Sequence, residues 1–411
     1  MRKTKKINLL LMIVLCAVMA LALAACGGGS TSTDNSATTD NSASTDNTAT
    51  TPDNSGTTTD TSTGEGLSGA DVAFIIPADD LLGINDRGWI QMTWTSTQDF
   101  ANQNGKTATW YRPLDNSTQG YYDAMTTAIN SGTKVIISLG SQCVDAIAQA
   151  ENDYPDTDFI CVEGNGIETQ LTSNTYAMFH QSDEAGFLAG IAAVKGGFKN
   201  IGVLTGLDIP PMNIWSYGYI QGINYQAGQD GVTGITVRQH YVNSAAASPD
   251  IQSLAASWYQ DGCDLIIPMM AGGNPSLFAA ADAAQKPCFG GDVDQGDQST
   301  MVLTGAIKKL EVTVPAALES VYNGTFPGGT YKWLNVDDNA VGLATGHWRM
   351  DQYGYTVDAY NTDFNNFKAD VNGQRSGILT EQNVRTDPNS DAFDALWSAI
   401  TTKNITFNNI K

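Results

Sequence analysis

The chain has 411 residues with 43 acidic residues against 21 Lys and Arg, so its formal net charge is −22 at pH 7. This charge disfavours nucleic acid as a partner, because binding a polyanion needs clustered Lys and Arg. The length exceeds what a single hydrophobic core usually supports, which predicts at least two lobes once the terminal segments are set aside.

The first residues form a targeting segment rather than part of the fold. MRKTKK is basic and INLLLMIVLCAVMALAL is apolar, and the segment closes with LAACG. This closing pattern resembles the lipobox of bacterial lipoproteins. The resemblance implies that residues 1–25 are a signal peptide and that Cys26 carries a lipid, which would hold the protein on the outer, extracytoplasmic face of the cytoplasmic membrane. A transmembrane anchor is the alternative, but the apolar run is short for a bilayer span.

Residues 26–68 repeat Thr, Asp, Asn and Ser, with no large apolar residue before Leu67. Such a composition cannot bury enough apolar surface to offset the entropy of ordering the chain. We therefore expect a disordered tether with an end-to-end distance of roughly 35 Å.

From Asp71 onward, short β-branched runs alternate with amphipathic stretches. The runs expected as strands are DVAFIIP, TATWYR, KVIISLG, DFICVEG, IGVLTG, ITVRQHYV and DLIIPM. Between such runs, residues 182–195 and 248–260 each place apolar side chains on one helical face. This strand–helix–strand order predicts an α/β fold with parallel sheets.

Polar loops follow the apolar runs. Their sequences are PADDLLGIND, GSQ, EGNG, GLDIPPMN, AGGNPS and GDVDQGD. In open parallel sheets, ligands bind at the carboxyl ends of the strands, where such loops emerge. Carboxylates and amides bind vicinal hydroxyls, and tryptophan faces stack on rings, so these loops suit a flat polyhydroxylated ligand.

The first of these loops leads into INDRGWIQMTW. Asp86 can cap a helix beginning at Arg87, and the Asn85 amide can then face a ligand. Trp89 and Trp94 are about 140° apart around a helix, so we expect one to pack and the other to stack. Spacing alone favours a core position for Trp94 over a ligand contact. A pure capping role for Asp86 is as compatible with the pattern as a binding role.

The sequence contains no catalytic motif, and we expect no catalytic residue, cofactor or metal ion. It lacks G-x-S-x-G, a P-loop, G-x-G-x-x-G before a helix, and H-x-x-x-H. The three histidines are isolated from metal-binding partners and are expected to be structural, namely His180, His240 and His347. The cysteines of the body lie in or beside apolar runs, which favours buried thiols over disulfides or metal ligands, namely Cys143, Cys161, Cys263 and Cys288.

Several segments in order carry a family resemblance. They are NDRGWIQMTW, DEAGFLAGIAA, IGVLTGLDIPP with WSYGYIQGI, FGGDVDQ, and VLTGAIKKLEVTVPAAL. Over about residues 71–344 they resemble the basic membrane protein family of lipoproteins, the purine nucleoside receptor type of substrate-binding protein for ABC importers. The resemblance implies a type I periplasmic-binding-protein fold, with two doubly wound parallel-sheet lobes joined by hinge strands and the nucleoside bound in the cleft.

The resemblance also implies a division of the chain and a set of partners. Lobe 1 is expected at residues 69–178 with about 303–345, and lobe 2 at 179–302. Residues 346–411 form a C-terminal extension to which the sequence assigns no role. The implied partners are a nucleoside, an ABC permease and a separate ATPase, and we expect a monomer.

Ligand-binding positions follow from matching the family's motifs residue by residue. They fall on Asn85, Asp86, Trp94, Trp215, Gly272 with Gly273, Asp292 and Lys308. In these roles the two indoles would clamp the base and carboxylates near Asp86 would bind ribose hydroxyls. Asp292 would accept from a ring N–H, and Lys308 would bind ribose or neutralise the carboxylates. The chain departs from the family at Asn85, where an aspartate is usual, and at Asn274-Pro275.

Two alternatives remain open. The same fold could bind a sugar or another small polar ligand, as a receptor or a sensor, because tryptophans beside acids also suit a pyranose. An enzyme of the nucleoside hydrolase type would need a divalent cation held by Asp292 and Asp294, and the local sequence supplies few further ligands.

Overall fold

The structure is a computed structural model that describes residues 69–78, 82–378 and 404–410. Three predictions concern residues outside the described ranges: the signal peptide at 1–25, the lipid on Cys26 and the tether at 26–68. Among the helices that are described, none is long and apolar enough to cross a membrane.

Six parallel strands form the first sheet. They are β1 (Val72–Ile75), β2 (Ala108–Tyr111), β3 (Val135–Leu139), β4 (Asp158–Val162), β5 (Thr175–His180) and β11 (Thr330–Leu334). Their order is β11-β5-β4-β3-β1-β2, and every neighbouring pair is parallel. The inner strands β1, β3 and β5 are buried along their whole length, and β4 is buried after its first residue, as expected for a parallel sheet covered on both faces.

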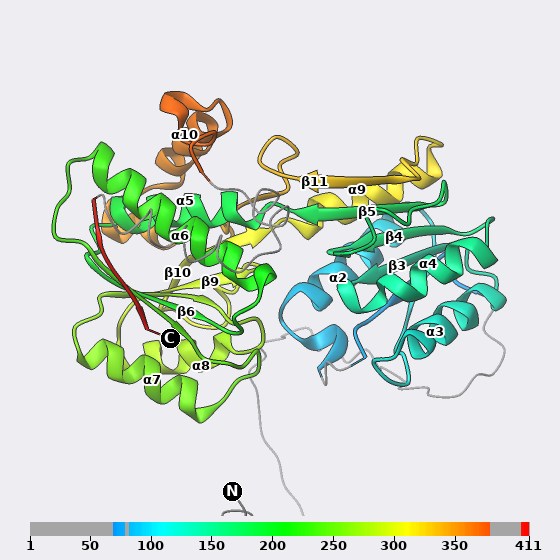
Figure 1. Ribbon diagram of the computed structural model, residues 1–411, viewed down its shortest axis with the longest axis horizontal. Coiled ribbons are helices and arrows are strands. Elements are labelled where there is room, and N and C mark those ends of the chain that lie inside the picture. Colours follow the sequence, from blue (N-terminus) through cyan, green and yellow to red (C-terminus); the bar gives the residue numbers. More distant parts are fainter. Residues whose placement is uncertain (1–68, 79–81, 379–403, 411) are drawn as a thin grey trace, which may run out of the picture. The chain divides into compact units, whose positions relative to one another are not determined.

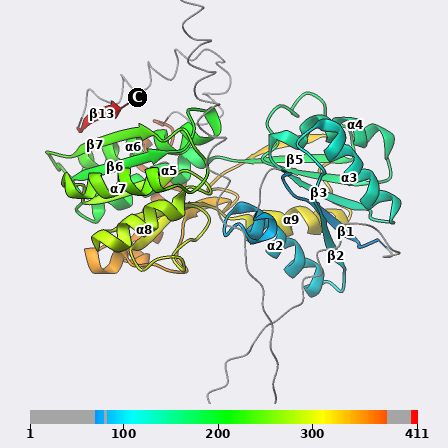
Figure 2. The same ribbon diagram turned by 90° about the horizontal axis from the view of Figure 1, so that it is seen from below.

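Helices cover both faces of the first sheet (Figure 1, Figure 2). On one face, α2 (Trp89–Gln103) and α9 (Leu310–Tyr322) pack against the strands. On the other, α3 (Thr118–Asn130) and α4 (Val144–Asp153) do so. Short 3-10 helices, η1 (Gly83–Asn85) and η2 (Ser141–Cys143), follow β1 and β3.

Seven strands form the second sheet. They are β6 (Asn200–Thr205), β7 (Thr236–Tyr241), β8 (Leu265–Met269), β9 (Cys288–Asp292), β10 (Val302–Lys308), β12 (Val341–Leu343) and β13 (Thr406–Ile410). Their order is β12-β10-β9-β8-β6-β7-β13, with β10 and β12 antiparallel and the other pairs parallel. The α/β class with parallel sheets is therefore confirmed.

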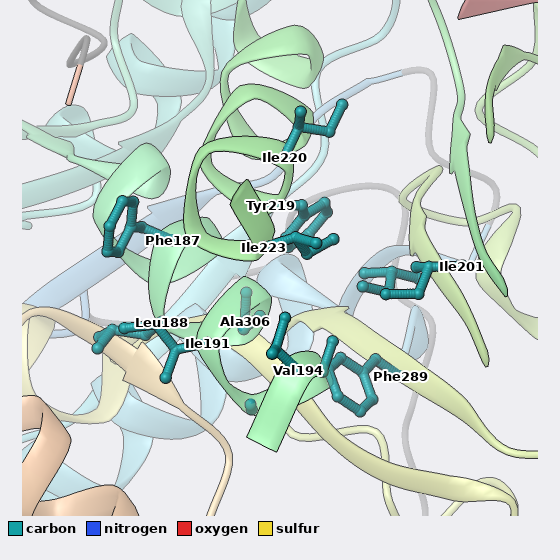
Figure 3. Close-up of a cluster of buried hydrophobic side chains, with 14 of the residues drawn as sticks. Phe187, Leu188, Ile191, Val194, Ile201, Tyr219, Ile220, Ile223, Phe289 and Ala306 are labelled. Atoms are coloured by element: carbon teal, nitrogen blue, oxygen red, sulfur yellow. The ribbon is translucent and has the colours of Figure 1, made fainter. Parts of the chain in front are cut away.

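The second sheet is also covered on both faces. Helices α5 (Ser182–Lys195) and α6 (Pro210–Gln229) pack on one face. Helices α7 (Pro249–Gln260) and α8 (Asn274–Ala284) pack on the other. Figure 3 shows part of the core of the second sheet, where Leu188, Ile191 and Val194 come from α5 and Phe289 from β9. The helices expected at 182–195 and 248–260 are thus confirmed.

Glycines allow α5 and α6 to approach closely. A side chain at Gly222 would place its Cβ 2.0 Å from Phe187 O, and one at Gly186 would lie 2.5 Å from Trp215 O. Gly190 and Gly218 face the same helix pair with similarly short distances of 2.4 and 2.3 Å. Because no larger residue fits at these positions, this contact fixes the position of α6, which carries Trp215.

Strand pairing divides the chain differently from the expected lobe boundaries in one place. Strand β12 and all of β10 except Val302 lie in the range 303–345 expected for lobe 1, but both strands pair in the second sheet, whereas α9 and β11 belong to the first. The described chain passes between the sheets after β5, after β10 and after β11. The apolar runs of β10 and β12 carry no signal of which sheet they join, so the sequence could not locate these crossings.

The described part of the C-terminal extension packs on the second sheet. Helix α10 (Val357–Lys368) places Phe367 with its ring centroid 5.2 Å from that of Phe187, and β13 pairs with β7 at the sheet edge. The 3-10 helices η3 (Met350–Tyr353) and η4 (Val371–Gly373) flank α10.

Beyond η4, Arg375 links two segments in which the chain passes between the sheets, namely the start of α5 and the loop after β11. Its Nε donates to Glu184 Oε1 at 2.6 Å and its Nη1 donates to Asp337 Oδ2 at 2.7 Å. Glu184 Oε2 also accepts the Val336 N–H at 2.9 Å. Burial raises the pKa of Glu184, against the opposing effects of the Val336 N–H and Arg375. We call Arg375, Glu184 and Asp337 the Arg375 clamp.

The four cysteines of the body are buried and free, as expected. Cys143 Sγ donates to Gly140 O at 2.9 Å, and burial raises the pKa of the Cys263 thiol to about 11. Such thiols behave as small apolar residues, because the reactive thiolate is disfavoured.

Candidate functional site

The segment after β1 is held by Asp86. Its Oδ1 accepts the N–H groups of Gly88 at 2.8 Å and Gln91 at 2.9 Å, and its Oδ2 accepts that of Ile90 at 3.2 Å. Asp86 therefore caps the helix. Helix α2 begins at Trp89 and not at Arg87, because Arg87 has a left-handed φ of 53° and the backbone of Gly88 is not helical. Asn85 closes η1 with an exposed side chain.

Both tryptophans of α2 are partly buried. Trp89 and Trp94 contact the core formed by α2, α9 and the first sheet. The packing expected of one of them is thus seen for both. A stacking role for Trp94 stays a prediction, and its partial exposure leaves part of the ring available.

The Lys308 ammonium lies close to two indole rings, one from α2 and one from α6. Its Nζ is 5.4 Å from the ring centroid of Trp89 on α2 and 5.5 Å from that of Trp215 on α6. These are cation–π distances, which favour an ammonium at this position. Trp215 is fully buried in the core of the second sheet. Sequence analysis assigned Trp215 to the site but gave Trp89 no ligand role.

Two carboxylates share the Lys308 ammonium. Its Nζ is 3.0 Å from Glu163 Oε2, at the end of β4 in the first sheet, and 3.5 Å from Asp292 Oδ1, at the end of β9 in the second. The three side chains are at most 8% exposed. Charges buried this deeply need partners, and here each has one of opposite sign. We call Lys308, Glu163, Asp292, Trp89 and Trp215 the Lys308 cluster.

Glu163 is also hydrogen-bonded to His180. Its Oε1 accepts the backbone N–H of His180 at 2.9 Å and lies 2.6 Å from His180 Nδ1. Burial alone would raise the pKa of Glu163, but the charge of Lys308 and the hydrogen bond from His180 outweigh burial and lower this pKa to about 2. An ionised carboxylate only accepts hydrogen bonds, so His180 Nδ1 carries the hydrogen. His180 Nε2 is hydrogen-bonded to Thr313 Oγ1 on α9 at 3.0 Å.

Glu163 is not among the predicted site residues, and His180 is predicted to be an isolated structural residue. The two are 17 positions apart, and they meet because β4 and β5 are parallel neighbours with their carboxyl ends together. Glu163 could have been found from its position at the end of the expected strand DFICVEG, whereas the strand that ends at His180 was not among the expected ones.

Asp292 has an oxygen without a hydrogen-bond donor. Its Oδ1 is buried and has no hydrogen-bond partner among the residues that the structure describes, and the Lys308 ion pair at 3.5 Å is long for a charge-assisted bond. The backbone of Asp292 is left-handed, with φ of 77°. Glu163 has the same feature at 59°. Non-glycine residues adopt this conformation infrequently, and strained backbone of this kind is enriched at functional sites.

The loop after β8 is fixed by close packing and by Asn274. A Cβ on Gly272 would lie 3.0 Å from Ala245 O. Asn274 is fully buried, and its Oδ1 accepts the Met270 N–H at 3.1 Å while its Nδ2 donates to Gln295 Oε1 at 3.0 Å. The departure from the family at Asn274 thus has a structural explanation, since its side chain joins the loops after β8 and β9.

Asp294 acts as a loop cap. Its Oδ1 accepts the Gly296 N–H at 3.0 Å and lies 3.2 Å from His347 Nδ1. Within the described ranges, no group of three or more His, Cys, Asp or Glu residues could hold a metal ion.

Two further features bear on the site. Gln298 Nε2, in the loop after β9, donates to Arg87 O before α2 at 3.3 Å, so polar contacts join the two sets of loops. A cavity of about 190 Å³ is lined by residues of α9, β5, β11 and the loops that flank β11, among them Tyr176, Thr313, Lys332 and Asp338. None of the predicted ligand-binding residues lines this cavity, so it is not part of the candidate site.

Comparison with known proteins gives a consistent result. Residues 71–368 match the family model described as ABC transporter substrate-binding protein PnrA-like. The chain is 27% identical over 287 residues to the ABC transporter nucleoside-binding protein BmpA of Lactococcus lactis, covering 64% of this chain and 79% of that one. It is 24% identical over 235 residues to basic membrane protein A1 of Borrelia garinii, covering 56% and 68%.

Solved structures show the same fold. An ABC transporter solute-binding protein from Aeropyrum pernix aligns with a TM-score of 0.62 at 17% identity, over 81% of this chain and 98% of that one. A second, from Conexibacter woesei, aligns with a TM-score of 0.59 at 17% identity, over 72% and 96%. The expected type I periplasmic-binding-protein fold is confirmed by these similarities.

Proposed function

Because the chain belongs to the PnrA-like family of ABC transporter substrate-binding proteins, we propose that it captures a nucleoside with a purine base and delivers it to a membrane permease. A separate ATPase would power the permease. A similar protein from Lactococcus lactis is named as nucleoside-binding, which supports this choice of ligand.

The observation that carries the proposal is the Lys308 cluster. It combines aromatic rings from α2 and α6, a buried ammonium, and a buried carboxylate oxygen to which no described residue donates a hydrogen bond. A purine nucleoside matches these groups, because its base offers a flat face and ring N–H groups, and its ribose offers hydroxyls.

The proposed roles of the individual residues combine this match with the positions that the family's motifs give. Trp94 and Trp215 stack on the base, and Asp292 Oδ1 accepts from a ring N–H. Asn85 and Asp86 bind ribose hydroxyls, and Gly272 lets the backbone after β8 approach the ligand. Lys308 neutralises the carboxylates and Trp89 helps to hold its ammonium. Ligand binding then stabilises a state in which the two sheets' loops close on the nucleoside.

The anchoring of the protein belongs to the same proposal. Cys26 carries the lipid, residues 26–68 tether the folded body, and the protein acts as a monomer on the outer face of the membrane. Detergent phase partitioning of the wild type and of Cys26→Ser tests the anchor: the wild type should enter the detergent phase and the variant should stay in the aqueous phase. Equal partitioning would contradict the lipid.

Mass spectrometry of the ligand released by denaturing the purified protein tests the nucleoside. We expect a purine nucleoside in roughly stoichiometric amount when the protein is purified without extensive dialysis. Tryptophan fluorescence of dialysed protein during titration with inosine, guanosine and adenosine is the second readout. A released pentose or hexose, with no response to nucleosides, would instead favour the sugar receptor.

The hydrolase alternative has a separate test. Inosine incubated with the protein and calcium should remain intact, and chromatography should detect no hypoxanthine above the rate without protein. Stoichiometric binding together with steady release of free base would contradict a pure transport role.

A further inference from the structure

Glu163 occupies a place in the Lys308 cluster that the proposed ligand contacts do not explain. It is buried at the end of β4, and its two oxygens accept three hydrogen bonds, two from His180 and one from Lys308. Its left-handed φ of 59° is unusual for a glutamate. The surrounding structure therefore maintains a strained backbone at Glu163 and positions both of its carboxylate oxygens.

The Lys308 ammonium is shared unequally between its two carboxylates. It lies 3.0 Å from Glu163 Oε2 but 3.5 Å from Asp292 Oδ1. Charge-assisted N–H···O bonds are usually about 2.7–2.9 Å long, so the contact with Glu163 is the stronger of the two. Asp292 Oδ1 consequently keeps its full capacity to accept another hydrogen bond, and it is buried without a donor from the described residues.

His180 fixes the position of Glu163. It donates to Glu163 Oε1 from Nδ1 and from its backbone N–H, and its Nε2 is hydrogen-bonded to Thr313 on α9. His180 ends β5 and Lys308 ends β10, so both residues precede crossings between the sheets. The carboxylate that holds the ammonium is therefore itself held rigidly.

We propose that Glu163 is a positioning residue that holds the Lys308 ammonium away from Asp292, so that Asp292 Oδ1 can accept a hydrogen bond from a ring N–H of the ligand. The inference rests on the proposed nucleoside function and deepens it. Without the Glu163 charge, Lys308 moves to Asp292 and competes with the ligand for its oxygen. Glu163 thus favours bases that have a donor on the six-membered ring.

The test compares two ligands with wild-type protein and Glu163→Gln. Inosine has a hydrogen on ring nitrogen N1, whereas purine riboside has the same shape without it. In calorimetric titrations we expect Glu163→Gln to weaken inosine binding about 10- to 100-fold, because a hydrogen bond to a charged acceptor is lost. Purine riboside binding should change less than about 3-fold.

A double variant separates positioning from general damage to the site. In the Asp292→Asn background, Glu163→Gln should weaken inosine binding by no more than about 2-fold, because the group on which it acts is gone. Equal losses for both ligands, or a full additional loss in the double variant, would overturn the proposal. The same substitution at Glu168, which is exposed on the following loop, is the matched control and should change neither affinity.

A milder variant covers the case in which Glu163→Gln does not fold. Thr313→Val removes only the hydroxyl that meets His180 Nε2. It should weaken inosine binding about 2- to 5-fold and leave purine riboside unaffected, whereas no difference between the ligands would count against the proposal.

The outcomes also separate this inference from the function on which it rests. Wild-type protein that binds neither nucleoside would contradict the proposed function. Wild-type protein that binds inosine no better than purine riboside would contradict the role of Asp292 Oδ1, and with it that of Glu163, while leaving nucleoside binding intact.

Discussion

The Lys308 cluster and the Arg375 clamp both place one cation between two carboxylates, but they differ in what they leave unsatisfied. In the clamp, Arg375 donates to both partners at 2.6 and 2.7 Å, and the other oxygen of Glu184 accepts a backbone N–H. In the Lys308 cluster, a buried oxygen of Asp292 lacks a donor among the described residues. A fully bonded cluster can only hold the structure, whereas one with a spare acceptor can also bind a ligand.

The two clusters also differ in electrostatics. The pKa of Glu163 is lowered to about 2 despite its burial, because Lys308 and His180 stabilise the ionised form. The pKa of Glu184 is raised, because burial outweighs the effects of Val336 and Arg375. Arg375 is partly exposed, so water screens the charge that it offers to Glu184. The predictions below test this distinction between a binding cluster and a structural clamp.

The largest effect is expected for Lys308→Met. The substitution leaves Glu163 and Asp292 buried without the ammonium, which should lower the free energy of unfolding by about 3–5 kcal/mol and abolish inosine binding. Urea denaturation and calorimetry measure the two effects. Lys332→Met is the matched control, because the Lys332 side chain is 51% exposed in its ion pair with Asp338. This substitution should lower the free energy of unfolding by less than about 1 kcal/mol. Similar losses for the two variants would contradict the importance assigned to the buried cluster.

The pH dependence of stability should have opposite signs at the two glutamates. Glu163 has a folded pKa of about 2 against a reference value of 4.5, so its contribution is complete above pH 4.5 and is lost as the pH falls toward 2. This contribution is about 3 kcal/mol. Urea denaturation between pH 3 and 5 should therefore show that the free energy of unfolding falls less steeply with decreasing pH in Glu163→Gln than in the wild type.

Glu184 should behave in the opposite way. Its pKa is raised above 4.5 in the folded state, so its effect is a loss of stability as the pH rises from 4.5 through the raised value. Glu184→Gln should remove that loss. For Glu163, the contradicting result is a Glu163→Gln variant whose free energy of unfolding falls with decreasing pH as steeply as that of the wild type. It would show that the Lys308 cluster does not hold Glu163 ionised.

Arg375→Met should affect stability and spare binding. It removes the only charged partner that the clamp gives to the buried Glu184, which should cost about 2 kcal/mol in the free energy of unfolding. Inosine affinity should change less than about 3-fold, because no predicted ligand contact depends on the clamp. Arg238→Met, which removes a 3.7 Å ion pair with the exposed Asp261, is the control. A large loss of affinity in Arg375→Met would show that the clamp takes part in ligand binding.

The smallest effects should separate the two tryptophans of α2. Trp94→Leu should weaken inosine binding about tenfold if its ring stacks on the base. Trp89→Leu removes a cation–π contact with Lys308 and should weaken binding about 3- to 5-fold. Fluorescence titration of both variants gives the order. The reverse order would assign the stacking contact to Trp89.

Some elements of the fold were predictable because local patterns determine them, whereas β5 and β9 to β13 were not among the expected strands. The helical periodicity at 182–195 and 248–260 corresponds to α5 and α7 within one residue at each end. The choice of sheet for β10 and β12 was not predictable, because a buried apolar run is equally suited to either sheet. Local signals were also misleading at Arg87, where a left-handed backbone delays the helix by two residues.

The site was predictable only as far as family motifs reach. Those motifs gave Asp292, Lys308 and Trp215, which the structure brings together. Glu163 and His180 meet through strand register, and Arg375 meets Glu184 across 191 positions, so no spacing along the chain indicates either contact. Residues that position others are therefore found from tertiary structure.

Calorimetric titration of the wild-type protein with inosine, with and without excess ribose, tests the central claim most directly. The account predicts saturable one-to-one binding of inosine that ribose displaces only at concentrations at least about 30-fold higher, because ribose lacks the base and its stacking contacts. No heat with any purine nucleoside, or displacement by ribose at equal concentration, would contradict it.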